Sequence, residues 1–121
     1  MFFRIFILAA TLFVSACSNM YSVEALAKKG EWYQIGYRDG ARGLASRPAG
    51  ELKHLAKGAI VDFSAYDKGY KQGIDEYCIV GNAYSIGLAG MPYHGVCSFS
   101  PDGLRFNLEW QRGYQAYQNS L

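Results

Sequence analysis

The stretch Tyr33-Gln-Ile-Gly36-Tyr37-Arg-Asp-Gly40 recurs further along the chain as Tyr66-Asp-Lys-Gly69-Tyr70-Lys-Gln-Gly73. Each copy has an aromatic residue followed by glycine, aromatic and glycine three, four and seven positions later. Residues at these spacings share one face of a helix that has 3.6 residues per turn. The repeat therefore predicts two helices that each present a face of glycines and aromatic rings.

Two weaker copies follow. Trp110-Gln-Arg-Gly113-Tyr114-Gln-Ala-Tyr117 has tyrosine in place of the last glycine, and Tyr84-Ser-Ile-Gly87-Leu-Ala-Gly90 is a degenerate copy whose second glycine comes one residue early. Glycine within a helix costs about 1 kcal/mol relative to alanine, so another helix or an aromatic ring should pack on the bare backbone. We expect the repeat aromatics to cover the glycines of neighbouring copies, and the polar residues between them, such as Arg38 and Asp39, to face water.

The remaining sequence predicts a mainly α-helical, small single domain of short helices. We expect helices over residues 22–29, 31–44, 49–57 and 66–78, and a last one from 100–102 to about 118. Pro48 suits the first position of its helix, and Ser64 is placed to cap the helix that carries the second repeat. Residues 81–100, rich in glycine, are expected to form an irregular insert.

The N-terminus has the pattern of a lipoprotein signal peptide. One basic residue precedes the apolar run Ile5 to Val14, and Val14-Ser15-Ala16-Cys17 resembles the lipobox of bacterial lipoprotein precursors. We expect cleavage before Cys17 and attachment of acyl chains there, so that 1–16 is the signal peptide, 17–30 the lipidated tether and 31–121 the globular domain. Ser18, rather than aspartate, favours the outer membrane, facing the periplasm. The alternative is an ordinary secretory signal with an incidental cysteine.

Two cysteines remain after Cys17. In the oxidising periplasm Cys78 and Cys97 should form a disulfide that closes the irregular insert. The alternatives are a catalytic thiol at Cys97 beside His94, or a metal site that also uses His54. No orienting third group accompanies the first, and the spacing for the second matches no zinc pattern, so we expect no metal and no cofactor.

Charge and motif content argue against several other functions. Loss of Arg4 with the signal peptide leaves 11 of the 12 basic residues against 10 acidic ones, and they are scattered, so no nucleic-acid partner is expected. The adjacent acids Asp75 and Glu76 point about 100° apart on a helix, and Ser98 and Ser100 lack a nucleophile elbow. Charged residues within the repeats exclude a membrane-spanning helix pair.

The combination of these motifs resembles the YfiL-type family of small bacterial envelope lipoproteins. The resemblance is carried by the doubled repeat, by Tyr77-Cys78, by the stretch from Gly87 to Cys97, and by Phe106-xxx-Trp110-xx-Gly113. It implies an envelope lipoprotein of unknown function and assigns no role to individual residues.

The function best supported by the sequence is a non-catalytic protein-interaction module attached to the membrane through Cys17. A glycan-binding or peptidoglycan-binding module is the alternative, and a small hydrolase is a weaker one. In either binding mode the ligand would meet aromatic rings, with these candidates: Trp32, Tyr37, Tyr70, Tyr84, Tyr93 and Trp110. The same rings could instead form the core of a domain poor in Leu and Ile. Their exposure distinguishes these interpretations.

Overall fold

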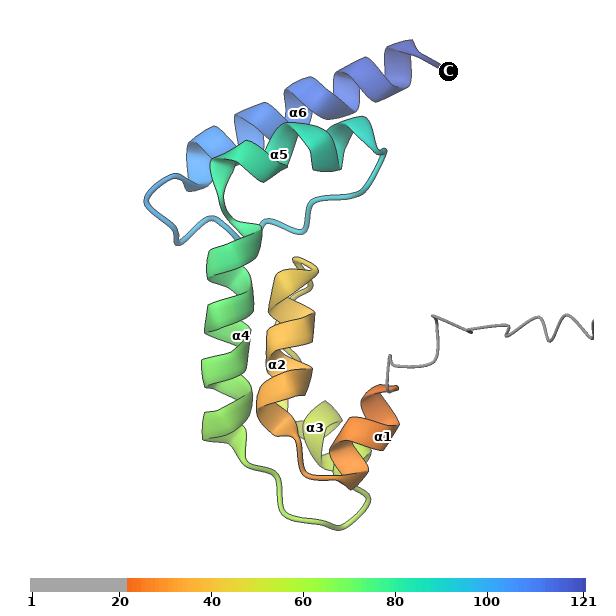
Figure 1. Cartoon of the computed structure of the whole chain (residues 1–121), viewed down its shortest axis with the longest axis vertical. Coiled ribbons are helices and arrows are strands. Elements are labelled where there is room, and N and C mark those ends of the chain that lie inside the picture. Colours follow the sequence, from red (N-terminus) through yellow and green to blue (C-terminus); the bar gives the residue numbers. More distant parts are fainter. Residues whose placement is uncertain (1–21) are drawn as a thin grey trace, which may run out of the picture.

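The computed structural model describes residues 22–121, so the predicted signal peptide and the lipidation site Cys17 lie outside the described residues. The described part is one small α-helical domain with six helices and no strand (Figure 1). The helices are α1 (Val23–Lys28), α2 (Trp32–Ala41), α3 (Ala49–Ala56), α4 (Phe63–Tyr77), α5 (Val80–Leu88) and α6 (Gly103–Asn119). The predicted fold class is confirmed.

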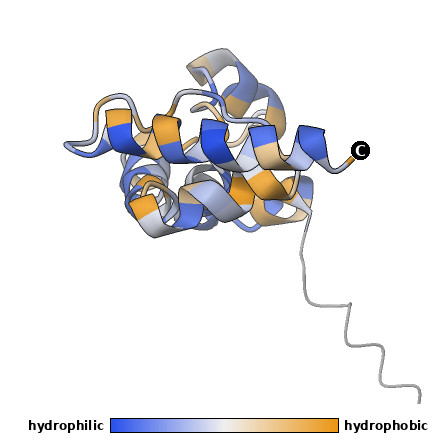
Figure 2. Ribbon diagram, turned by 90° about the horizontal axis from the view of Figure 1, so that it is seen from above, coloured by the Kyte–Doolittle hydropathy of each residue, from blue (hydrophilic) through white to orange (hydrophobic). Residues whose placement is uncertain are grey.

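The fold is built on two parallel helix pairs, α2 with α4 and α5 with α6 (Figure 1). In the first pair, Gly36 lies against Tyr66 and Tyr70, and Gly40 lies one turn further along both helices. Each pair is joined by a crossover, residues 42–62 in the first and 89–102 in the second. In Figure 1 the second pair lies across the end of α4, while α1 and α3 lie near its start. Viewed from above, polar and apolar residues alternate along the helices, as in helices that bury only one face (Figure 2).

Glycines allow the paired helices to touch backbone to backbone. A Cβ at Gly36 would lie 2.0 Å from the Tyr66 carbonyl oxygen, and one at Gly69 would lie 2.0 Å from that of Tyr33. Gly87 and Gly113 make the same kind of contact between α5 and α6. The prediction of close packing on glycine is confirmed, but a neighbouring helix covers these positions where aromatic rings were expected.

Rings cover two other glycines, which end α2 and α5. Gly43 and Gly90 adopt φ values of +69° and +74°, which disfavour a side chain, and they face the rings of Tyr77 and Tyr117 respectively. The weaker repeats are therefore aligned differently from the predicted register. Tyr84-xx-Gly87-xx-Gly90 matches Tyr37-xx-Gly40-xx-Gly43, and Trp110-xx-Gly113-xxx-Tyr117 matches Tyr70-xx-Gly73-xxx-Tyr77. The second pair thus repeats the later part of the first pair without an early glycine.

This alignment explains the main error in the predicted elements. Residues 81–100 were expected to be irregular, but α5 occupies Val80–Leu88, because its glycines serve helix contact and helix termination. The cap of α4 is Asp62, whose carboxylate accepts from the Ala65 amide, in place of Ser64. Pro48 is the N-cap of α3, with extended backbone, in place of its first helical residue.

The hydrophobic residues form two cores that α4 connects. The first core lies among α1 to α4 and the second among the end of α4, α5, α6 and the second crossover. Cys78 and Cys97 form a disulfide inside the second core, with Cα atoms 5.5 Å apart, as predicted. The bond ties the end of α4 to the second crossover.

Candidate functional site

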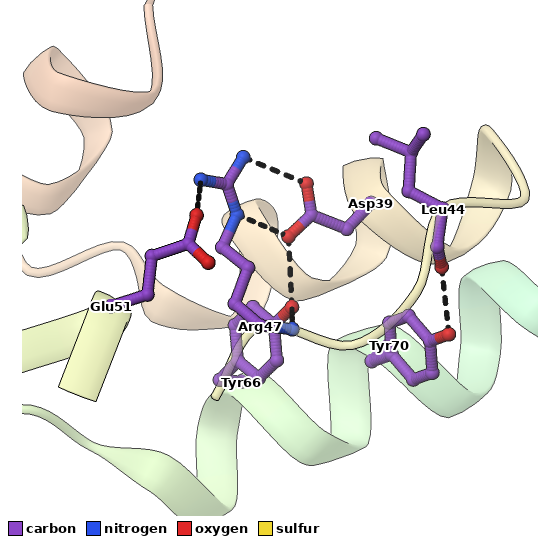
Figure 3. Close-up of polar contacts among 6 residues, drawn as sticks. All are labelled: Asp39, Leu44, Arg47, Glu51, Tyr66 and Tyr70. Carbon is purple, nitrogen blue, oxygen red and sulfur yellow. Dashed lines mark hydrogen bonds and ion pairs between the residues drawn. The ribbon is translucent and has the colours of Figure 1, made fainter. Parts of the chain in front are cut away.

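A polar cluster centred on Asp39 holds the first crossover against α2 and α4 (Figure 3). Arg47 donates from Nε and Nη2 to the two Asp39 carboxylate oxygens at 2.8 and 3.2 Å, and from Nη1 to Glu51 at 3.0 Å. The Tyr66 hydroxyl also donates to Asp39, at 2.8 Å, and accepts from the Arg47 amide at 2.9 Å. Three hydrogen bonds therefore converge on one carboxylate.

Burial makes this cluster electrostatically strong. Asp39 is only 3% exposed, so its charge requires the guanidinium beside it. The hydrogen bonds from Arg47 to Asp39 raise the pKa of Arg47 further above its usual value. Burial raises the pKa of Tyr66 to about 12, although the Arg47 amide that donates to its hydroxyl acts in the opposite direction. Arg47 therefore stays charged and Tyr66 stays neutral over the physiological pH range.

The prediction that Asp39 faces water is wrong. Asp39 lies four residues after Ile35 and three after Gly36, which places it on the buried face of α2. The register of Asp39 indicates burial, whereas its charge favours exposure. Because protein donors already occupy three of the carboxylate's roughly four acceptor positions, the arrangement acts as a structural clamp.

The second helix pair has a hydrogen bond equivalent to one in the first pair, but it lacks the charged clamp. Tyr70 donates from its hydroxyl to the Leu44 carbonyl at 2.7 Å, and Trp110 donates from Nε1 to the Met91 carbonyl at 2.9 Å. Both bonds fix the residue that follows a helix-ending glycine. Where the first pair has Asp39 and Tyr66, the aligned positions of the second pair hold Ile86 and Phe106.

The six candidate aromatics are mainly structural. Trp32 lies in the first core at 2% exposure, which leaves no ring face for a ligand. The other five are half-buried. Tyr70 and Trp110 donate the hydrogen bonds described above. Tyr93 accepts from the Cys97 amide at 3.0 Å and packs edge-on against the Phe106 ring.

The last two candidates are Tyr37 and Tyr84. Tyr37 donates to the Glu76 carboxylate, and that hydrogen bond is the main reason why the pKa of Tyr37 is raised. The guanidinium of Arg112 lies 4.2 Å from the centre of the Tyr84 ring, so a cation already covers one face of this ring. These contacts leave little free ring surface on which a sugar could stack.

A cleft between the two helix pairs is a better candidate for binding. It has a volume of about 490 Å³ and is bordered by the end of α2, the end of α4, α5 and the start of the second crossover. Its apolar wall contains Ile86, Met91 and Pro92, and polar groups from Arg42, Glu76 and Ser85 stand around it. Met91 is 56% exposed.

Two of these polar groups, Glu76 and Arg42, differ in whether other side chains already form hydrogen bonds with them. Glu76 accepts from the hydroxyl of Tyr37 and, at 3.4 Å, from the amide of Gln72. Within residues 22–121 the exposed Arg42 side chain makes no hydrogen bond or ion pair. None of the cleft residues was a predicted site residue, because the cleft arises only where the two pairs meet. The one available signal was the exposed pair Met91-Pro92 directly after a helix-ending glycine.

The groups considered for catalysis or metal binding do not form a site. Cys97 is consumed by the disulfide, so it offers no thiol to His94. Across residues 22–121 no three His, Cys, Asp or Glu side chains are placed to hold a metal ion together. In the same part of the chain no helix has the length and hydropathy that a bilayer-spanning segment needs.

Fold and cleft together define a small α-helical domain in which two glycine-packed helix pairs border a surface cleft. The chain belongs to the family described as "Protein of unknown function (DUF2799)", whose profile matches residues 31–115. The match begins one residue before α2 and ends within α6, so it spans both helix pairs. Comparisons with characterised proteins and with solved structures gave no match.

Proposed function

We propose that this chain is a non-catalytic protein-interaction module of a bacterial envelope, attached through acyl chains on Cys17 and facing the periplasm from the outer membrane. The observation that carries the proposal is the cleft between the helix pairs, which combines an apolar wall with the exposed guanidinium of Arg42. The sequence Val14-Ser15-Ala16-Cys17 supports the anchor. A place among the YfiL-type lipoproteins is supported by other sequence features, namely the doubled repeat, Tyr77-Cys78, the stretch from Gly87 to Cys97 and Phe106-xxx-Trp110-xx-Gly113.

The cleft indicates the chemistry of its partner. An apolar side chain would be buried against Ile86, Met91 and Pro92, and a carboxylate on the partner would face Arg42. Small sites of this type bind through a few apolar anchors, with polar groups that fix orientation. A short apolar and acidic segment of another envelope protein fits this description. A glycan fits it less well, because the available ring faces are half-buried.

Site-specific photo-crosslinking in the native envelope tests the proposal. A photoreactive residue at Ser85, which lines the cleft, should capture one protein partner, while the same residue at the exposed Gln115 on α6 should not. The capture should be lost in Arg42→Glu and Met91→Ser variants and retained in Leu104→Ser, whose position is 72% exposed and does not line the cleft. Circular dichroism would confirm that each variant is folded.

Two outcomes would overturn the assignment. Equal capture from positions 85 and 115 would show that the cleft is not the binding surface. Binding to purified peptidoglycan, with no protein captured from position 85, would favour the glycan-binding alternative. Fatty-acid labelling that persists in a Cys17→Ser variant would separately disprove the anchor.

A further inference from the structure

The loop between α3 and α4 exposes apolar side chains that the core does not require. Ile60 is 93% exposed and Phe63, the first residue of α4, is 41% exposed. Between them Val61 packs on the first core and fixes the loop to the domain. Lys57 and Gly58 have positive φ values, +50° and +90°, which end α3 and turn the chain outward. A single exposed isoleucine is ordinary on a protein surface, so its location decides whether it has a role.

The short length of chain between Cys17 and α1 supplies that location. Only five residues lead from Cys17 to Ser22, the cap of α1, and at about 3.5 Å per residue they span at most about 18 Å. A lipid on Cys17 would therefore hold α1 close to the bilayer. Because α1 packs on α3, the loop that follows α3 lies at the same end of the molecule, whereas α5 and α6 lie at the other (Figure 1).

Charges at this end favour an anionic surface. Three exposed lysines, Lys28 on α1, Lys53 on α3 and Lys57 in the loop, accompany Ile60. The acids Glu24, Glu31 and Asp62 lie at the same end. With the neighbouring Lys29 there are four lysines against these three acids, which leaves a net charge of about +1. Basic residues around an apolar side chain are the usual composition of a contact with the headgroups of anionic lipids.

We propose that the loop of residues 57–63 is a second membrane contact, in which Ile60 and Phe63 enter the interface of an anionic bilayer. The proposal rests on the lipid anchor of the proposed function, but it is independent of the partner in the cleft. With both attachments in place, the first helix pair stands on the membrane. The second pair and the cleft are then directed away from the bilayer.

Depth-dependent fluorescence quenching tests the contact in the full lipidated chain. The protein is reconstituted in vesicles of phosphatidylethanolamine and phosphatidylglycerol that contain a spin-labelled lipid, with an environment-sensitive fluorophore on Ile60→Cys. The matched control carries the fluorophore on Gln115→Cys, an exposed position of α6. We expect quenching several-fold stronger at position 60 than at position 115. Equal quenching, or none at position 60, would overturn the contact.

A second variant tests whether the two apolar side chains make the contact. A fluorophore on Ala59→Cys should be quenched in the otherwise unchanged chain, and Ile60→Asn with Phe63→Ser should reduce that quenching to the level of position 115. Unchanged quenching would overturn the assignment to these side chains.

The mass of the N-terminal peptide separates the two proposals. A chain without acyl groups at Cys17 would overturn the anchor and this contact together, whereas an acylated chain without quenching would overturn this contact alone.

Discussion

Replacement of Gly36 by alanine tests whether the two helices of the first pair depend on backbone contact. The new Cβ would lie 2.0 Å from the Tyr66 carbonyl oxygen, 2.9 Å from the carbonyl carbon and 2.9 Å from the Tyr70 nitrogen. Real Cβ atoms keep at least 3.0 Å from such neighbours, so α2 and α4 must separate by about 1 Å. The neighbour is backbone, which cannot turn away as a side chain would.

The free energy follows from two opposing effects. Overpacking of this kind costs about 3 kcal/mol at the upper end of its usual range, while alanine in a helix gains about 1 kcal/mol over glycine. We expect Gly36→Ala to lower the free energy of unfolding by about 2 kcal/mol and the melting temperature by about 10 °C. Urea denaturation followed by circular dichroism measures this change.

Two further variants separate the contact from the general effect of glycine. Gly50→Ala, in α3 with no atom within 4 Å of the added Cβ, should raise stability by about 0.5 kcal/mol. Gly69→Ala should cost as much as Gly36→Ala, and the double variant should cost less than their sum, because one separation of the helices relieves both clashes. A Gly36→Ala protein as stable as the parent would refute the reasoning.

Three other perturbations probe the clamp and the disulfide. Asp39→Ala leaves the partly buried guanidinium of Arg47 with only the exposed Glu51 as a partner and should cost about 3 kcal/mol in urea denaturation. Glu51→Ala, at an exposed pair, should cost less than about 0.5 kcal/mol; equal costs would contradict the clamp. Because the folded-state pKa of Tyr66 is raised to about 12, its contribution to stability is complete below about pH 10 and is lost as the pH rises through 12, by at most about 2.7 kcal/mol. Denaturation from pH 9 to 12 should show this loss, and Tyr66→Phe should remove it. Reduction of Cys78–Cys97, which are 19 residues apart, should cost about 3 kcal/mol in thermal unfolding, and reductant should have no effect on a variant with serine at both positions.

The helices were predictable wherever the repeat spacing was intact. The positions of Tyr33 to Gly40 and Tyr66 to Gly73 gave α2 and α4, because helical periodicity is a local property of the sequence. The partner on the glycines was not predictable, since a bare backbone accepts either a ring or another helix. The helix α5 was not predicted because glycines usually interrupt a helix. Here Gly87 lies in the helix contact, and Gly90 ends the helix.

The site was less predictable than the fold. Asp39 has the register of a buried residue and the charge of an exposed one, and its Arg47 partner comes from a crossover whose path the repeat does not encode. The cleft depends on how the end of α4 meets α5, which the second core and the disulfide determine together. Neither the pairing of Asp39 with Arg47 nor the cleft can be predicted from the spacing of residues along one helix.

The parallel direction of the two helix pairs affects the order in which the chain folds. Antiparallel helices can pair through a short turn, but α2 cannot reach α4 in the parallel sense until residues 42–62 have passed back along the pair. The entropy lost in closing this loop precedes any gain from the glycine contacts. Arg47 bonds to Asp39 and to Tyr66 from within this loop, so in the folded chain the clamp fixes the early part of the return path.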